Sequence, residues 1–345
     1  MSRSARPEPT ANHDRTGPVQ RQRLPELDIL KAVAIVAVVL IHAIPPFWVR
    51  DVTTVEKVIG HLTRFAVPAF LAVSGFLYYQ PTPIDIGQVR RRLRRILPPY
   101  VCVSLLAFGY DTVFPGHAVT PTLAAGLVWG GTFGPYYYVV LLVQFVCVTW
   151  LLSRLPSMVP DLLLLPAAGT ALWADVHLWV FADPFWTARN SCVWAVWFLL
   201  GWVAAARRDA LFRVTARRRI AILAVVGGAV AIAIGTIVSG RVGIGVARTL
   251  ALMTVPGCIL WLFTVGRNLS QTPGWASLLS QWTYAIYLLH PFFIYMVGDI
   301  VEPTTGLPLA RWWVLNWVVG LTGAVAATAL LRQVLGSRSR TVIGA

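Results

Sequence analysis

Charged side chains are scarce in this sequence: they make up 12% of its 345 residues, whereas hydrophobic residues make up 57% and the mean hydropathy is +0.67. A soluble domain carries about 25% charged residues, so this deficit excludes an ordinary soluble enzyme. Acidic residues are rarer than basic ones: the sequence has 14 Asp and Glu and 29 Lys and Arg, which gives a net charge of +15. Because the positive charges form short clusters between apolar runs, we interpret them as topology signals and expect no nucleic-acid partner.

Cysteine is also rare, with four residues that each lie inside an apolar stretch and form no CxxC pair or zinc-ligand spacing. We therefore expect no metal site and interpret these cysteines as small buried hydrophobes. Residues 1–26 lack the apolar core of a cleavable signal peptide. They are polar, Pro-rich and basic, and we predict that they form a disordered cytoplasmic tail.

Long apolar runs fill most of the remaining chain, many of them near the length of about 20 residues that a membrane helix needs. We predict an all-α, polytopic transmembrane helical bundle with about ten spans, near 29–47, 58–80, 96–114, 136–153, 159–174, 191–206, 220–239, 247–266, 276–298 and 312–332. Residues 120–130 could form a re-entrant piece.

The distribution of Lys and Arg predicts the orientation of the chain. With a cytoplasmic N-terminus, 22 of these residues fall inside and six outside, which favours both termini being cytoplasmic. The connections are short and no internal repeat is evident. We therefore predict one membrane domain, 27–335, followed by a short cytoplasmic tail, 336–345.

Two polar side chains share one face of the first predicted helix. Lys31 and His42 are eleven positions apart, which is about 20° beyond three full turns and a rise of about 16 Å. Lys31 would lie at the cytoplasmic rim and His42 beyond the midplane of a core about 30 Å thick. Lys31 could alternatively be a snorkelling anchor and His42 a packing histidine.

Two other helices bring cationic or ionisable groups to the depth of His42. Arg64 lies about 9 Å into the second span, before Pro68, which we expect to kink the helix. His290 precedes Pro291 in the ninth span and reaches the same outer half. Such convergence is typical of a functional site, although Arg64 could also be an interfacial anchor.

A basic run stands at the cytoplasmic side of the third span. It reads Arg90-Arg91-Arg92-Leu93-Arg94-Arg95 and is followed by Pro98-Pro99. Clustered guanidinium groups bind phosphates, either those of lipid headgroups or those of a nucleotide-containing donor.

Four motifs together resemble the membrane acyltransferase-3 family. In the first motif a basic residue, Lys31, is followed by ten residues and then by His42. The other three are the segment Arg64 to Phe76, the Arg-x-x-Arg element within Arg91 to Pro98, and Tyr284 to Pro291 with its Y-x-x-Y-L-x-H-P pattern. Position 31 is Lys where Arg is common in the family, and Ala32 stands where many members have Gly. The likeness is to the stand-alone branch, since no hydrolase-like domain follows the last helix.

This resemblance implies an integral membrane O-acyltransferase of the bacterial plasma membrane. Relatives move acetyl or other acyl groups from cytoplasmic acyl-CoA to hydroxyls of surface polysaccharides, glycolipids or related acceptors. We expect acetyl-CoA as the donor, a saccharide or glycolipid acceptor, surrounding membrane lipids and no metal. A transporter or flippase of a lipid-linked saccharide is the alternative, since intramembrane charges also mark substrate pathways.

Acyl transfer requires a base, charge stabilisation for the oxyanion and a means of binding the donor. We predict His42 as the base, with Arg64 and His290 orienting it or stabilising charge. The residues expected to bind the phosphates of acyl-CoA are Lys31, Arg91, Arg92, Arg94 and Arg95.

Overall fold

The structure is a computed structural model that describes residues 24–44, 53–177, 183–216, 244–306 and 312–345, with four isolated positions between 220 and 228. The described residues form helices and no strand, in agreement with the predicted all-α class. In chain order the helices are α1 (Pro25–Ala43), α2 (Thr54–Leu62), η1 (Thr63–Phe65), α3 (Ala66–Tyr78), α4 (Ile86–Val113), α5 (Leu123–Trp129), η2 (Gly134–Tyr136), α6 (Tyr137–Leu152), α7 (Val159–Val176), α9 (Pro184–Arg189), α10 (Ser191–Ala206), α11 (Arg208–Ala216), α13 (Ile244–Arg267), α14 (Gly274–Thr305), α15 (Trp313–Leu335), η4 (Gly336–Arg338) and α16 (Ser339–Val342).

The predicted spans correspond to helices along most of the chain. The span 191–206 coincides with α10 residue for residue, and the predicted re-entrant piece 120–130 contains the short helix α5. The span 220–239 lies almost entirely outside the described residues.

Four described segments are long and apolar enough to cross a membrane, namely Ile86–Val113, Gly134–Leu152, Gly274–Thr305 and Trp313–Val342. Three shorter apolar helices cover Thr63–Tyr78, Val159–Ala174 and Val255–Arg267. The count of about ten and the cytoplasmic termini stay predictions.

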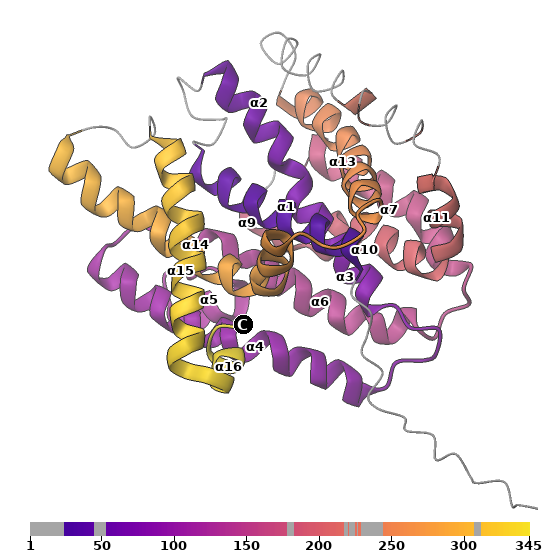
Figure 1. Cartoon of the computed structure of the whole chain (residues 1–345), viewed down its shortest axis with the longest axis horizontal. Coiled ribbons are helices and arrows are strands. Elements are labelled where there is room, and N and C mark those ends of the chain that lie inside the picture. The colour runs from indigo at the N-terminus through magenta and orange to yellow at the C-terminus, as the bar shows by residue number, and fades with distance from the viewer. Residues whose placement is uncertain are drawn as a thin grey trace, which may run out of the picture.

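Helix α1 lies inside the bundle, where it contacts α3, α13, α14 and α15 (Figure 1). Its residues Ala32, Ala34 and Ile35 are fully buried. The indole of Trp317 on α15 donates to the carbonyl of Val36 on α1, at 3.4 Å. The helix that carries Lys31 and His42 is therefore held by neighbours on several sides.

Helices α3 and α10 touch backbone to backbone. A Cβ added at Gly75 would lie 2.1 Å from the carbonyl oxygen of Phe198, and one added at Gly201 would lie 1.8 Å from that of Ala72. Small residues allow such close approach between membrane helices, where dispersion forces replace the hydrophobic effect. This contact fixes α3, which follows η1 directly.

The break in the second predicted span lies one turn before Pro68. Pro68 has no N–H to donate to the carbonyl of Arg64, four residues earlier, which removes one α-helical hydrogen bond and weakens the α-helix in that turn. The chain instead forms the 3₁₀ turn η1 at Thr63–Phe65 and resumes as α3 at Ala66. The predicted distortion is present, but it falls at Arg64 itself.

The last ten residues pack against the bundle. They form η4 and α16, α16 contacts α4, and Ile343 is buried. The hydroxyl of Ser339 donates to the carbonyl of Ala345, at 2.6 Å.

Candidate functional site

The structure brings His42 and His290 together. Their ring centroids are 5.4 Å apart, with 32° between the ring planes. His42 stands at the end of α1 and is exposed, whereas His290 lies in the middle of α14 and is completely buried. One imidazole is therefore accessible to a reactant, and the second stands behind it.

The two helices run in parallel, because they are also joined near their starts. The Ser280 hydroxyl on α14 donates to the Asp28 carboxylate on α1. Asp28 contacts Ser280, and His42 contacts His290, so the residue numbers increase in the same direction along both helices. Both helices therefore point in the same direction within the bundle, and their orientation across the membrane stays a prediction.

Pro291 determines the tautomer of His290. A proline at position 291 cannot donate to the carbonyl of Tyr287, four residues earlier, so that carbonyl lacks its helical partner. The Nδ1 of His290 lies 2.7 Å from the same carbonyl oxygen. Since a carbonyl only accepts, Nδ1 carries the proton and donates.

The other ring nitrogen of His290 follows from this assignment. In a neutral imidazole with a protonated Nδ1, Nε2 carries a lone pair and can only accept a hydrogen bond. That Nε2 is buried and has no hydrogen-bond partner in the described residues. A buried acceptor without a partner is costly, so it marks a place where a donor from His42, a water molecule or a substrate would be stabilised.

The tyrosines of the Tyr284 to Pro291 pattern lock α14 in place. Tyr284 donates to the carbonyl of Ile96 on α4, at 2.8 Å. Tyr287 donates to the carbonyl of Pro135 in η2, and Tyr136 of η2 donates back to the carbonyl of Leu288, at 2.6 Å. These bonds fix the position of α14 in the turn just before His290.

Sequence reasoning missed Tyr136 and Ser280, which position the site from outside the four motifs. Tyr136 lies in an aromatic run, Tyr136-Tyr137-Tyr138, that reads as an apolar helix start. Ser280 is four residues before Tyr284, at helical spacing on the same face, which is a signal that could have identified it.

Lys31 lies on α1 beside a carboxylate. Its Nζ is 3.3 Å from Asp28, which also accepts the hydrogen bond from Ser280. Asp28 is 8% exposed, and its second oxygen has no hydrogen-bond partner among the described residues. Lys31 is thus oriented by α14 through Asp28, on the same helix as His42 but eleven residues away.

The basic run at the start of α4 divides into two kinds of side chain. Arg92 donates to the Thr149 hydroxyl at 3.0 Å and to the Tyr78 carbonyl at 3.1 Å, and its guanidinium lies over the Tyr78 ring. Arg92 therefore joins α4 to α3 and α6. The side chains of Arg91, Arg94 and Arg95 are exposed.

Arg64 is half-buried in η1, which packs against both α1 and α13. The structure therefore places it on a segment that touches the helix of His42. Its action on the histidines stays a prediction.

A second polar cluster lies farther along α14. Asp299 accepts from Tyr110, and its two oxygens lie 3.1 and 3.0 Å from Nε2 of His117, whose ring stacks on Tyr295. These groups satisfy one another and join α14 to the end of α4 and the loop that follows it. Their long separation in sequence left no pattern from which to predict the cluster.

Within the described ranges, no group of three or more His, Cys, Asp or Glu side chains could hold a metal ion. The exposed imidazole of His42 beside the buried His290 makes this pair a candidate site for proton transfer to or from a reactant.

Comparison with known protein families matches residues 24–332 to the acyltransferase domain of the acyltransferase-3 family. The matched region includes His42, Arg64, His290 and the basic run. No curated protein and no solved structure matches this chain.

Proposed function

Because the chain belongs to the acyltransferase-3 family, we propose that it moves an acyl group, acetyl in the simplest case, from cytoplasmic acyl-CoA to a hydroxyl of a surface saccharide or glycolipid. The observation that carries this proposal is the accessible His42 beside the buried His290. We further propose the bacterial plasma membrane as its location.

His42 acts as the general base. As the acceptor hydroxyl attacks the thioester carbonyl, His42 takes the hydroxyl proton, and the new C–O bond forms. The tetrahedral intermediate then loses CoA, since the C–S bond breaks and His42 returns the proton to the sulfur. No group besides the two substrates is consumed.

His290 is assigned to orientation and not to binding the oxyanion. An oxyanion site needs a donor, whereas Nε2 of neutral His290 only accepts. It can accept an N–H of His42, directly or through one water molecule, and so direct the lone pair of His42 to the reactant. Arg64 is the cation that we propose for the oxyanion.

The donor is bound at the other end of α1. Lys31, held by Asp28, and the exposed Arg91, Arg94 and Arg95 are the proposed contacts for the phosphates of CoA. Arg92 already has partners in α3 and α6, so we assign it to stability. The pantetheine arm would extend along α1 toward His42, a rise of about 16 Å from Lys31.

The test is a pair of histidine substitutions. The protein is reconstituted into proteoliposomes with radiolabelled acetyl-CoA and the glycan and glycolipid fractions of the producing cells. His42→Ala should lower label transfer at least a hundredfold, the usual minimum for a lost general base. The matched control is His177→Ala, an exposed histidine at the end of α7 that stacks on Trp173.

Thermal unfolding of both variants should match the parent protein within a few degrees, because neither side chain is buried. Transfer by His42→Ala near the parent rate would refute the base assignment. Translocation of a labelled lipid-linked saccharide by the parent protein, without acyl transfer, would favour the transporter instead.

A further inference from the structure

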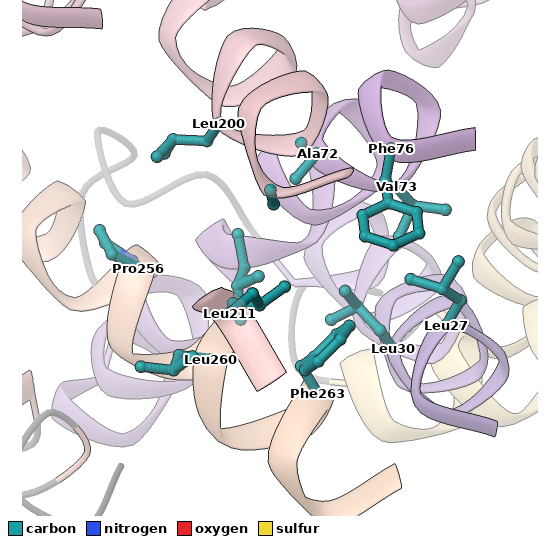
Figure 2. A pocket seen from close by; sticks show the side chains of 13 residues that line it. Leu27, Leu30, Ala72, Val73, Phe76, Leu200, Leu211, Pro256, Leu260 and Phe263 are labelled. Carbon is teal, nitrogen blue, oxygen red and sulfur yellow. The ribbon is translucent and has the colours of Figure 1, made fainter. Parts of the chain in front are cut away.

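An apolar cavity of about 240 Å³ lies between five helices, away from both histidines. Figure 2 shows Leu27 and Leu30 of α1, Phe76 of α3, Leu211 of α11 and Phe263 of α13 around it. Every residue that lines it is apolar. A cavity of this kind suits a hydrocarbon chain and offers nothing to hold a polar reactant.

Two cationic groups lie over the ring of Phe212, the residue that follows the cavity-lining Leu211 on α11. The guanidinium groups of Arg208 and Arg267 lie 4.8 and 4.3 Å from the centre of one ring, that of Phe212. Arg267 also donates to the carbonyl of Phe212, which fixes its position. Both arginines are exposed.

The sequence spacing connects these cations to the cavity. Arg208 is three residues before Leu211 on α11, and Arg267 is four residues after Phe263 on α13. Each guanidinium group therefore belongs to the helical turn next to a residue that lines the cavity.

The charged side chains around α11 and the end of α13 leave a net positive charge, because Arg207, Arg208, Arg213 and Arg267 outnumber Asp161, Asp209 and Glu26, whose backbone lies beside Gly266. Arg207 is paired with Asp161 on α7, and Asp209 is the acidic side chain at the start of α11. An apolar cavity beside two guanidinium groups is complementary to an amphiphile with a phosphate head and a hydrocarbon tail.

The proposed acyl donor has this chemistry too, but its reacting atom would be misplaced here. Leu30 is twelve residues before His42, a rise of about 18 Å along α1. The pantetheine arm separates the thioester of acyl-CoA from the phosphates. A donor with its acyl chain in this cavity and its phosphates at Arg208 and Arg267 would have to fold that arm back on itself, and its thioester would lie beside the cavity, far from the base. A membrane lipid does not have to bring a reacting atom to His42.

We propose that this cavity binds one acyl chain of an anionic membrane phospholipid, whose phosphate is held by Arg208 and Arg267. The bound lipid would brace α11 against α1, α3, α10 and α13. This inference is independent of the proposed acyl transfer.

Native mass spectrometry of the purified protein in detergent tests it, with phosphatidylglycerol and phosphatidylcholine of the same chains added in equal amounts. The parent protein should retain phosphatidylglycerol at least fivefold better. Arg208→Gln with Arg267→Gln should abolish that preference, and Arg208→Gln alone, which keeps the bond from Arg267 to Phe212, should reduce it. Arg338→Gln with Arg340→Gln is the charge-matched control and should leave the preference unchanged.

Filling the cavity tests the chain-binding part. Ala204→Phe adds a ring at the cavity wall and should release both lipids equally, with melting temperature as the check on folding. Undiminished preference in the Arg208 and Arg267 variants would overturn the proposal. Tighter retention of palmitoyl-CoA than of phosphatidylglycerol would also overturn it, in favour of the acyl donor.

Discussion

A double-mutant cycle on His42 and His290 tests whether His42 is the general base and His290 only orients it. If His290 acts only by accepting a hydrogen bond from His42, His290→Ala removes the orientation of the base and leaves the base itself. A hydrogen bond to a charged group, such as the imidazolium formed during transfer, contributes about 1.5–3 kcal/mol. At about 1.4 kcal/mol per factor of ten, we expect kcat to fall roughly ten- to a hundredfold.

The two substitutions should not be additive. Loss of His42 should cost at least a hundredfold, and the double variant should be no slower than His42→Ala alone, because orientation has no effect without a base. The assay is initial-rate transfer from radiolabelled acetyl-CoA in proteoliposomes, with kcat and KM determined separately. Since His290 is buried, melting curves of each variant accompany the rates.

Multiplication of the two losses in the double variant would refute this reasoning, because His290 would then act on the reactants independently of His42. A loss in His290→Ala equal to that in His42→Ala would instead point to His290 as an essential group in its own right. An unchanged rate in His290→Ala would show that its Nε2 orients nothing.

The remaining predictions concern the donor, the helix packing and the sidedness of the reaction. Substitution of Arg94 and Arg95 by Gln should raise KM for acyl-CoA far more than KM for the acceptor, whereas Arg92→Gln should mainly lower the melting temperature; equal effects on both substrates would favour lipid anchoring. Gly201→Ala should destabilise the protein by about 1–3 kcal/mol, because its Cβ would lie 1.8 Å from a backbone carbonyl oxygen. Gly169→Ala, with open space around it, is the control and should be tolerated. Similar melting temperatures of the two variants would contradict the close contact. In sealed proteoliposomes of known orientation, acyl-CoA on the side of the N-terminus should acylate an acceptor confined to the other side, and transfer only when both substrates share one side would exclude this arrangement.

The linear sequence was sufficient to predict the helical class and several element bounds. Scarce charge and long apolar runs predict membrane helices because the bilayer rejects unpaired polar groups and the backbone must satisfy its own hydrogen bonds. Helix α10 coincides with one of these apolar runs, 191–206, residue for residue. The common face of Lys31 and His42 follows from helical periodicity alone, since both lie on the single helix α1.

Only the tertiary structure decided what surrounds those residues. The approach of His42 to His290, the bond from Ser280 to Asp28 and the reciprocal bonds of Tyr136 each join segments far apart in the chain, and periodicity along one helix contains no information on which face meets another. The basic run shows the same limit. Its five arginines form one cluster in the sequence, and only the packing of α3 and α6 separates the bound Arg92 from its four exposed neighbours. The tautomer of His290 depends on both the sequence and the tertiary structure. The sequence supplies Pro291, which leaves the carbonyl of Tyr287 without its helical donor. The tertiary structure sets the rotamer of His290 that directs Nδ1 to this carbonyl.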